Sequence, residues 1–324
     1  MADVGLVGYG AWGQNLARVL HHEGVLKAII DIDEARLSHA VSTHHFVMTY
    51  LDFEDALHHS KMDAVVVAVP PRAAKRIIEI ALKAGLHVLT EKPLALSYDG
   101  ALDLCELAEK TERVLMVDHI FRYSPAVRLV WSLIRSGVIG TLRHVSLKRL
   151  GGAQSGGSRV LWDLAVHDLS ILAGLGIGTP INVRALRQNI LRILYDHATL
   201  NLMYESDLIM SVQIEVGWVA PRKRREGLFV GSEGMIEYDE LSPDAKVKIF
   251  RADGDVLIPH LEWREPLALM IDDFLALVAI HSRPVVSREA GWGQIQLAKN
   301  ELLIYQILDM AEKSAKEGGK CVSL

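Results

Sequence analysis

The sequence predicts an α/β protein of two domains, the first a doubly wound parallel sheet. A chain of 324 residues, half of them hydrophobic, is long for a single ordinary core. Short apolar runs alternate with amphipathic stretches as far as about residue 120, which is typical of successive β-α-β units. Beyond residue 140 the pattern changes to longer strands with alternating polarity. We expect one domain over residues 1–120 and a second over 121–324.

The overall composition excludes several classes of protein. A net charge of −5 and a pI near 6.3 argue against a nucleic-acid-binding surface. No apolar run approaches the roughly 18 residues that a membrane span needs, and no basic segment precedes the first strand. Cys105 and Cys321 form neither a CxxC pair nor a disulfide framework, so a reducing cytoplasm is expected. We expect no metal site, because the histidines in three adjacent pairs would point in different directions.

A glycine-rich turn follows the first expected strand. Residues 3–7 are apolar enough for a short buried strand, and a GxGxxG pattern comes directly after it. In this position the glycines permit a tight turn, close approach of a pyrophosphate and close packing of the next helix. The residues expected to bind a dinucleotide here are Gly8, Tyr9, Gly10, Ala11, Trp12 and Gly13.

An acidic residue ends the second expected strand, residues 26–30. Asp31 lies 18 residues after Gly13, where a carboxylate accepts hydrogen bonds from the adenosine ribose. This arrangement favours NAD over NADP, with Ile32 also beside the cofactor. No arginine is expected beside the ribose 2′ position, because Arg36 comes several residues later. The alternative is that Asp31 only opens a turn.

Later strands end in further candidate residues. Apolar runs at 64–69, 87–90 and 114–117 alternate with helical patterns at 73–84 and 97–111. Ligands of doubly wound sheets bind outside the carboxyl ends of the strands. Val69 and Pro70 follow one strand, and Glu91 and Lys92 follow the next. Pro93 restricts the backbone of Lys92, which fixes its direction.

The segment Trp162–Asp168, WDLAVHD, pairs a carboxylate with an imidazole. If it is helical, Asp163 and His167 share one face and could meet a single substrate. The glycine-rich residues 151–158 precede it and suit a loop that covers a ligand. The alternative is that Asp163 caps a helix and His167 is a satisfied core histidine.

The second half reads as strands closed by helices. Ser124 and Pro125 are a good helix start, with the serine hydroxyl as cap, and Gly137 ends that helix. Strands are expected at 142–150, 181–191, 198–205 and 208–216, and the turn at 231–234 indicates a hairpin. Residues 266–279 and 292–315 are expected to be helical.

Taken together, four motifs resemble the Gfo/Idh/MocA family of sugar and polyol dehydrogenases. They are GYGAWG at Gly8, EKP at Glu91 followed by LALS, HIFRYSP at His119, and WDLAVHD at Trp162, in family order. The resemblance implies a Rossmann domain followed by an α/β domain with a large, mostly antiparallel open sheet. It also implies an active site between the domains and a homodimer or homotetramer formed through the open sheet face. The chain departs from the family at Asp118, usually glycine, and at Ala74, often histidine.

The same resemblance implies roles for individual residues. Lys92, Asp163 and His167 would be catalytic in the NAD-dependent oxidation of a secondary alcohol, and His119 would join the cofactor site. His167 would take the hydroxyl proton and Lys92 would stabilise the developing alkoxide, although these two roles could be exchanged. The implied substrate-binding residues are Lys92, Arg122, Tyr123, Arg159, Trp162, Asp163 and His167.

Residues 160–170 are more similar to the nucleotide-sugar 3-dehydrogenases of this family than to its inositol or glucose enzymes. This implies oxidation at C3 of UDP-N-acetylglucosamine, toward a 3-amino sugar of a cell-surface glycan of the lipid A or O-antigen type. Arg122, Arg159 and the basic cluster 222–225 could face the pyrophosphate, or could be solvated surface arginines. The alternatives are a free sugar or inositol dehydrogenase and a non-catalytic NAD-binding regulator.

Overall fold

The computed structural model describes residues 2–152, 159–191, 195–204, 210–281 and 290–324, with the side chains of 290–299 left out. The chain divides into two compact units. The first consists of Met1–Ile120 and Glu265–Leu302, and the second of Phe121–Arg264 and Leu303–Leu324. The first segment of unit one ends at Ile120, and residues 265–302 group with it rather than with the second unit. The reason is that helix α8 (Pro266–His281) packs against helix α1 (Ala11–His22).

The first unit is built on a six-stranded parallel sheet in the order β3-β2-β1-β4-β5-β6. Apart from the half-buried edge strand at residues 48–50, its strands are mostly buried and largely aliphatic, as parallel strands covered on both faces must be. They are β1 (Val4–Val7), β2 (Leu26–Ile30), β3 (Met48–Tyr50), β4 (Ala64–Val67), β5 (His87–Glu91) and β6 (Leu115–Asp118). The predicted doubly wound fold is confirmed.

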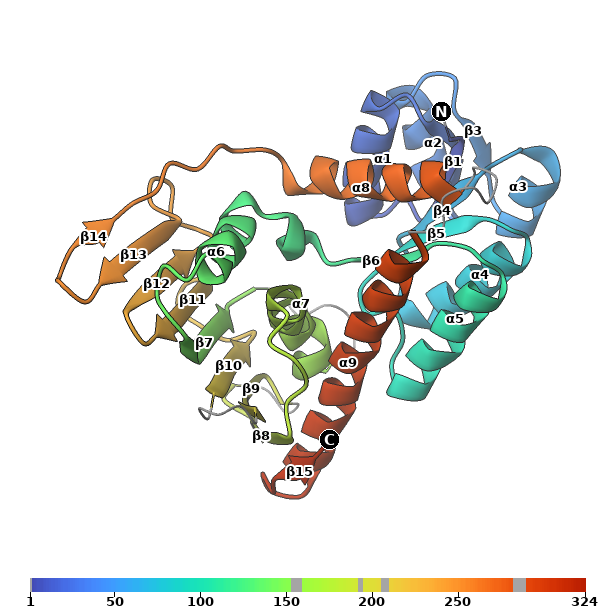
Figure 1. The fold of residues 1–324 in the computed structure, drawn as a ribbon. Coiled ribbons are helices and arrows are strands. Elements are labelled where there is room, and N and C mark those ends of the chain that lie inside the picture. The colour runs from blue at the N-terminus through green and yellow to red at the C-terminus, as the bar shows by residue number, and fades with distance from the viewer. Residues whose placement is uncertain (1, 153–158, 192–194, 205–209, 282–289) are drawn as a thin grey trace. The chain divides into compact units, whose positions relative to one another are not determined.

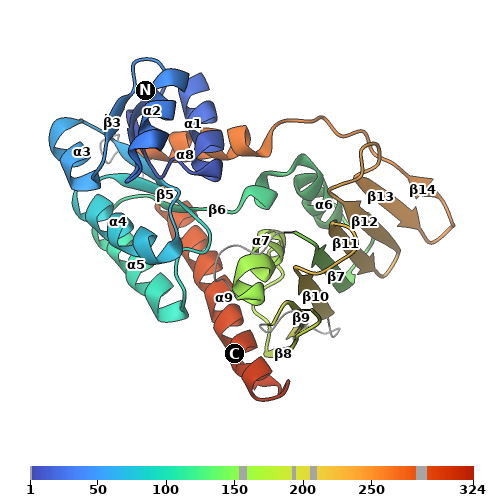
Figure 2. The same ribbon diagram turned by 180° about the vertical axis from the view of Figure 1, so that it is seen from behind.

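Helices connect these strands and cover the sheet. Figure 1 and Figure 2 show α1 and α2 on one side of it and α4 and α5 on the other. The connecting helices after α1 are α2 (Glu34–Thr43), α3 (Phe53–His59), α4 (Pro71–Lys83) and α5 (Tyr98–Lys110). Asp33 and Asp52 cap α2 and α3, each carboxylate accepting two backbone N–H bonds. Because all the strands run in parallel, their carboxyl ends lie at one edge of the sheet.

The second unit contains a nine-stranded sheet in the order β14-β13-β12-β11-β7-β10-β9-β8-β15. Among the described strands of this sheet, β7 and β10 are the only pair in parallel, so the predicted mostly antiparallel open sheet is confirmed. The strands are β7 (Leu142–Leu150), β8 (Asn182–Gln188), β9 (His197–Tyr204), β10 (Met210–Gly217), β11 (Arg224–Gly231), β12 (Gly234–Asp239), β13 (Val247–Arg251), β14 (Val256–Leu257) and β15 (Val322–Ser323). The predicted 231–234 hairpin joins β11 to β12.

Helices cover one face of this sheet, and the alternation of side chains shows which. In β10 the aliphatic residues Val212, Ile214 and Val216 are buried, while Gln213 on the other face is exposed. The helical elements of this region are η1 (Ile120–Tyr123), α6 (Pro125–Arg135), η2 (Leu161–Ala165) and α7 (Val166–Leu175), and α6 and η2 contact the sheet. Helix α9 (Ala290–Lys316) contributes residues to both units.

One local prediction in this unit is wrong. Ser124 precedes α6, but its hydroxyl makes no cap hydrogen bond. It donates instead to Glu240 Oε2, at 2.8 Å. Pro125 still occupies the first turn, where its missing N–H costs nothing.

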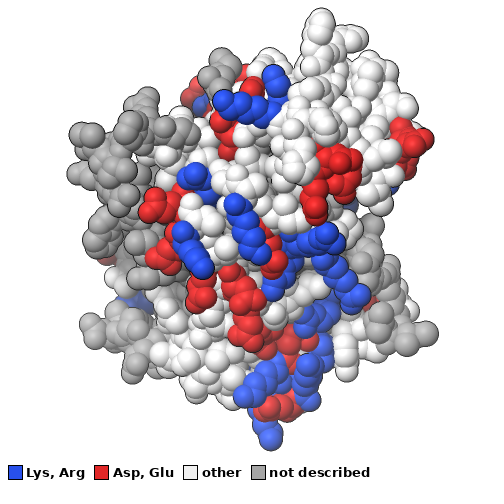
Figure 3. Space-filling model, turned by 90° about the vertical axis from the view of Figure 1, so that its right-hand side faces the viewer, with Lys and Arg blue, Asp and Glu red and all other residues white. Residues whose placement is uncertain are grey.

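The described surface carries charges of both signs. On the face drawn in Figure 3, basic and acidic side chains lie interspersed. This agrees with the small net charge of the chain. Among the described residues there is no cluster of three metal-ligating side chains, and no described helix has the length and hydropathy of a membrane span.

Candidate functional site

The glycine turn after β1 has three glycines, two of which leave no room for a side chain while the third borders open space. A Cβ on Gly8, whose φ is +97°, would lie 2.4 Å from the Ala68 carbonyl oxygen, and one on Gly13 would lie 2.0 Å from the Gly8 carbonyl oxygen. Both positions therefore exclude side chains within the protein itself. A Cβ on Gly10 would meet nothing within 4 Å. This open space beside the backbone is where a pyrophosphate would need to approach.

The N-terminus of α1 completes this cradle. Gly10 is its N-cap residue and supplies no side-chain cap, and the first turn has no acidic residue. The first N–H groups of the helix, with the positive end of its dipole, therefore remain suited to an anion. The residues present fit the diphosphate of a dinucleotide.

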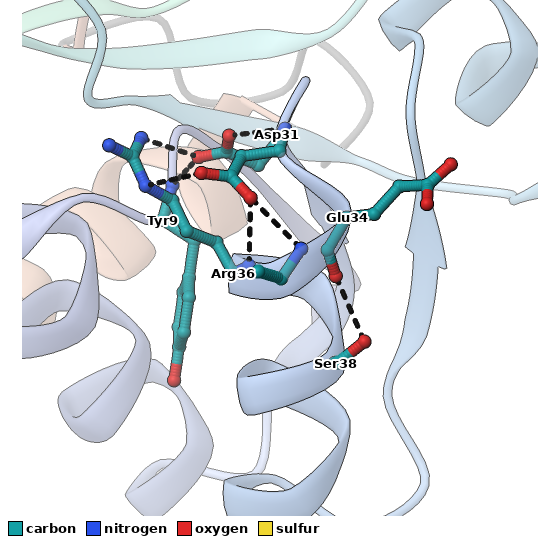
Figure 4. Close-up of polar contacts among 7 residues, drawn as sticks. Tyr9, Asp31, Glu34, Arg36 and Ser38 are labelled. Carbon is teal, nitrogen blue, oxygen red and sulfur yellow. Dashed lines mark hydrogen bonds and ion pairs between the residues drawn. The ribbon is translucent and has the colours of Figure 1, made fainter.

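Asp31 is buried directly after β2 and is held by several donors (Figure 4). Its carboxylate accepts hydrogen bonds from the backbone N–H of Tyr9 at 2.7 Å and of Asp33 at 3.0 Å. The following Ile32 is 91% exposed, which leaves its side chain available to a ligand. Asp31 thus ties the glycine turn to the end of the neighbouring strand.

The expectation of no arginine beside the ribose 2′ position overlooked Arg36, which lies next to Asp31. Arg36 lies in the first turn of α2, and its Nη1 is 3.5 Å from Asp31 Oδ2 while its Nε is 3.5 Å from Asp33 Oδ2. A helix that starts at residue 34 brings residue 36 back over the strand end. The local charge is therefore two carboxylates and one half-exposed guanidinium.

Glu91 and Asp118 lie opposite one another at the carboxyl ends of β5 and β6. Desolvation and the Asp118 carboxylate raise the pKa of Glu91 well above its usual range, whereas the charge of Lys92 lowers it. Asp118 Oδ2 also accepts a hydrogen bond from Trp12 Nε1 at 3.0 Å. Asp118 thus connects the glycine turn to the strand that leads to Lys92.

Three other expected cofactor-binding residues, Val69, Pro70 and His119, also lie in the first unit. Val69 follows β4, and its Cγ1 is 2.8 Å from where a Cβ on Gly8 would be, so it packs against the glycine turn with Pro70 next in the chain. His119 is buried, and its Nε2 lies 2.9 Å from both carboxylate oxygens of Glu301. The imidazole edge at Nε2 is therefore engaged by Glu301.

Asp163 and His167 lie on one continuous helical stretch in the second unit. Asp163 belongs to a π-helical turn, η2, and His167 to α7, which follows without a break. Single π-helical turns are often found at functional sites. Asp163 is buried and does not cap the helix, because its carboxylate accepts a hydrogen bond from Trp218 Nε1 at 2.8 Å.

His167 is half-buried, and its Nδ1 lies among the buried atoms. Its ring packs against Phe121, with 5.1 Å between ring centroids and an interplanar angle of 73°. Asp168, the next residue, is buried and accepts two hydrogen bonds from Arg149. A half-buried histidine and an oriented carboxylate therefore lie on one helical segment, an arrangement suited to moving a proton and orienting a hydroxyl.

Known proteins match both halves of the chain. Residues 2–119 match the oxidoreductase family with an NAD-binding Rossmann fold, and residues 127–237 match the Gfo/Idh/MocA C-terminal domain. The chain belongs to the Gfo/Idh/MocA family. Its first unit is an NAD-binding Rossmann domain.

Several members of this family have related sequences. UDP-N-acetylglucosamine 3-dehydrogenase from Acidithiobacillus ferrooxidans is 28% identical over 70% of this chain and 73% of that protein. Inositol 2-dehydrogenase from Corynebacterium glutamicum is 30% identical, and the match covers 56% of each protein. The matched region thus spans only about half of the latter relative.

Solved structures of family members share the whole fold. The Acidithiobacillus ferrooxidans 3-dehydrogenase gives a TM-score of 0.81 at 23% identity, with 97% of this chain and 99% of that one covered. Scyllo-inositol dehydrogenase from Lactobacillus casei, solved with NAD(H) and scyllo-inositol, gives 0.79 at 18% identity over 100% and 99%. At these identities the likeness shows the fold and leaves the substrate open.

The arginines expected to meet a substrate have different surroundings in this family member. Arg159 is exposed and lies over the Trp162 ring, with its Cζ 4.6 Å from the centroid. In the cluster at 222–225, Arg224 forms a bidentate pair with Glu226, and Arg225 donates to the carbonyls of Leu150 and Gly151. Residues 153–158 of the expected covering loop lie outside the described part of the chain.

Arg122 and Tyr123 are both partly exposed in the short helix η1. The Arg122 carbonyl accepts a hydrogen bond from Arg128 Nε at 3.3 Å, and the Arg128 guanidinium lies 4.8 Å from the Tyr123 ring centroid. Arg128 therefore holds this short helix against the start of α6 through its contacts with both Arg122 and Tyr123.

The sequence reasoning missed the partners that hold these groups. Trp218 binds Asp163, Phe121 packs against His167, Arg149 binds Asp168, and Glu301 binds His119. Each partner lies far away in sequence from the group it contacts. Only Phe121 stood inside a motif already noticed, HIFRYSP, and so offered a signal.

Proposed function

We propose that the chain is an NAD-dependent dehydrogenase that oxidises C3 of UDP-N-acetylglucosamine, giving the 3-keto sugar for later transamination. The observation that carries an alcohol oxidation is the helical segment that presents a half-buried His167 beside Asp163, whose carboxylate Trp218 orients. The relationship to a UDP-N-acetylglucosamine 3-dehydrogenase, which extends over 70% of the chain, supports the choice of substrate.

Bound NAD supplies the hydride acceptor, C4 of its nicotinamide. In the proposed reaction His167 accepts the proton of the substrate hydroxyl, for which an imidazole is suited near neutral pH. The Lys92 ammonium stabilises the negative charge that develops on that oxygen. Asp163 accepts a hydrogen bond from a neighbouring hydroxyl and so orients the sugar. The alternative in which Lys92 takes the proton and His167 stabilises the charge uses the same residues.

Recognition of the diphosphate needs cationic side chains. Arg159 is the strongest candidate because it is exposed, while its stacking on Trp162 limits the conformations of its guanidinium. Arg122 and Arg222 are further candidates, whereas Arg224 and Arg225 already bind groups of their own unit. We therefore expect Arg159→Ala to raise the KM for the UDP-sugar and to leave the Kd for NAD unchanged.

We further propose that the protein is a homodimer or homotetramer that works in the cytoplasm. The sheet face away from the helices carries Met203, Leu228 and Met235, each 37–40% exposed, among polar side chains. A second copy would remove this mixed surface from water. Light scattering after size exclusion should give at least twice the 35.9 kDa of one chain, and Leu228→Lys should reduce that mass. Two free cysteines fit a reducing compartment.

The test is turnover followed by NADH absorbance. The protein is incubated with NAD and UDP-N-acetylglucosamine, with a 3-aminotransferase system that removes the keto product. We expect NADH to form with the UDP-sugar and not with N-acetylglucosamine. A second candidate is an inositol dehydrogenase, which the 30% identity to inositol 2-dehydrogenase favours. Turnover of inositols but not of UDP-sugars would establish that alternative. NAD binding without turnover of any sugar would indicate a non-catalytic regulator.

A further inference from the structure

Arg149 lies near the end of β7 and is almost completely buried, with 3% of its side chain exposed. Its Nε and Nη2 donate to the two carboxylate oxygens of Asp168 at 3.0 and 2.9 Å. Such a bidentate pair fixes the plane of the guanidinium as well as its position. Because Asp168 directly follows His167 in α7, this pair restrains the backbone that carries the imidazole.

The flat face of the same guanidinium covers Phe121. Its Cζ lies 4.1 Å from the centroid of the Phe121 ring. Phe121 in turn makes the edge-to-face contact with His167, at 5.1 Å between centroids. Guanidinium and aromatic faces attract each other, more strongly when water is excluded. Arg149 thus acts on His167 along two routes, through Asp168 and the backbone, and through the Phe121 ring.

The buried pair has no evident advantage for stability alone. Well-packed apolar residues often replace a buried ion pair without loss of stability, because both charges had to leave water. An apolar side chain at position 149 would fill the volume, but it would neither fix Asp168 nor hold Phe121 with a defined plane. The arrangement is therefore better explained by a requirement for the direction of the His167 ring.

We propose that Arg149 is a positioning residue for His167, holding the imidazole in one orientation through its bidentate bond to Asp168 and its stacking on Phe121. The proposal deepens the proposed function, since it concerns the proton acceptor of that reaction. Its physical content, a single orientation of the His167 ring, can be measured without any substrate.

The test uses histidine labelled with ¹³C at the ring, with the His167 signal assigned from its absence in His167→Asn. In the native protein the Phe121 ring current should displace this signal. Phe121→Leu should remove the displacement, Phe121→Tyr should retain it, and Arg149→Met should diminish it or split the signal in two. The matched control is Arg187→Met, which removes another arginine of this unit, 13% exposed, that binds a carboxylate, Glu312, and lies over the Tyr195 ring. It should leave the His167 signal unchanged.

Kinetics gives a second reading. Misorientation of a catalytic group should lower kcat about tenfold to a hundredfold in Arg149→Met, with the KM for the sugar and the Kd for NAD nearly unchanged. If Arg149→Met does not fold, Arg149→Lys keeps a cation beside Asp168 but loses the flat face, and should move the signal in the same direction. A folded Arg149 variant whose His167 signal matches the native one would overturn the proposal. Full kcat in His167→Asn would instead refute the proposed function, whatever the spectra show.

Discussion

The two units bring their site residues together in different ways. In the first unit the glycine turn, Asp31 and the Glu91–Lys92 pair all follow a strand directly, and the parallel sheet places those strand ends along one edge. In the second unit Asp163 and His167 come from one helical segment, but Trp218 reaches Asp163 from 55 positions away in sequence. The parallel, doubly wound topology alone thus places the candidate ligand-binding residues of the first unit along one edge. In the second unit the placement of the candidate site residues depends on the packing of particular side chains.

This difference suggests that cofactor binding and sugar turnover depend on different units. Residues of the first unit should govern the affinity for NAD, and residues of the second should govern turnover of the sugar. Lys92 is the expected exception, because it lies in the first unit but is proposed to act on the substrate. Substitutions in one unit at a time can therefore test whether cofactor affinity and turnover depend on different units.

The largest expected effect is that of Lys92→Ala. Loss of the ammonium that stabilises the developing alkoxide should lower kcat by about 10² to 10⁴, while the Kd for NAD stays close to the native value. Steady-state rates at saturating NAD, with calorimetry for the cofactor, measure both quantities. Lys75→Ala is the control, because Lys75 lies in α4 and pairs with Asp103 at the surface. Native kcat in Lys92→Ala would remove Lys92 from the mechanism.

Two glycine substitutions separate folding from cofactor binding in the first unit. Gly13→Ala pushes a methyl group against the Gly8 carbonyl oxygen and should lower the free energy of unfolding by about 1–3 kcal/mol, even without NAD. Gly10→Ala places its methyl in open space and should leave the unliganded protein as stable as the native one. It should still weaken NAD binding, because the methyl occupies the approach of the diphosphate. Equal stability losses in both variants would show that the space at Gly10 is not a ligand cradle.

Acid should weaken the first unit through His87. Burial, with the charges of Arg113 and His281, lowers the pKa of His87 to about 4 from an ordinary 6.5, against an opposing effect of Asp63. In the unfolded chain the imidazole takes up a proton near pH 6.5, whereas in the folded protein it does so only near pH 4. The contribution of neutral His87 to the free energy of unfolding is therefore fully present above pH 6.5 and is lost as the pH falls toward 4. At pH 5 the loss is about 2 kcal/mol.

Urea unfolding at pH 7 and pH 5 measures this loss. In the native protein His87 Nδ1 accepts a hydrogen bond from the Val114 N–H at 3.0 Å. His87→Asn keeps an acceptor near this N–H and should lose less stability between the two pH values. His58→Asn, at an exposed histidine, should behave like the native protein. An unchanged pH dependence in His87→Asn would contradict the assignment.

Cofactor preference should respond to Asp31 with a change of about tenfold. We expect the native protein to bind NAD at least tenfold more tightly than NADP, because the 2′-phosphate would meet the carboxylates of Asp31 and Asp33. Asp31→Ser should remove most of this preference without an added arginine, since Arg36 is already beside the site. Calorimetry with both cofactors measures the ratio, and Asp52→Ser, which removes a cap carboxylate of α3, is the control. Similar native Kd values for NAD and NADP would refute the role of Asp31.

The same difference between the units explains what the sequence could predict. Local patterns were enough for the parallel sheet, the glycine turn and the position of Asp31, because each depends on neighbours in sequence. They also placed Asp163 and His167 on one helical segment. They did not reveal Arg36 beside Asp31, the engagement of Ser124 with Glu240, or the contacts of Trp218 and Arg149. Those depend on side-chain direction and on packing between distant segments, which periodicity does not encode.

The proposal that cofactor binding and sugar turnover depend on different units is tested most directly by the affinity of His167→Asn for NAD. His167 belongs to the second unit, whereas the residues that fit the cofactor belong to the first. Calorimetry should therefore give a Kd for NAD within about twofold of the native value, although kcat in the same preparation falls by about 10² or more. A Kd raised tenfold or more in a fully folded His167→Asn protein would show that the second unit holds the cofactor, and would contradict the account.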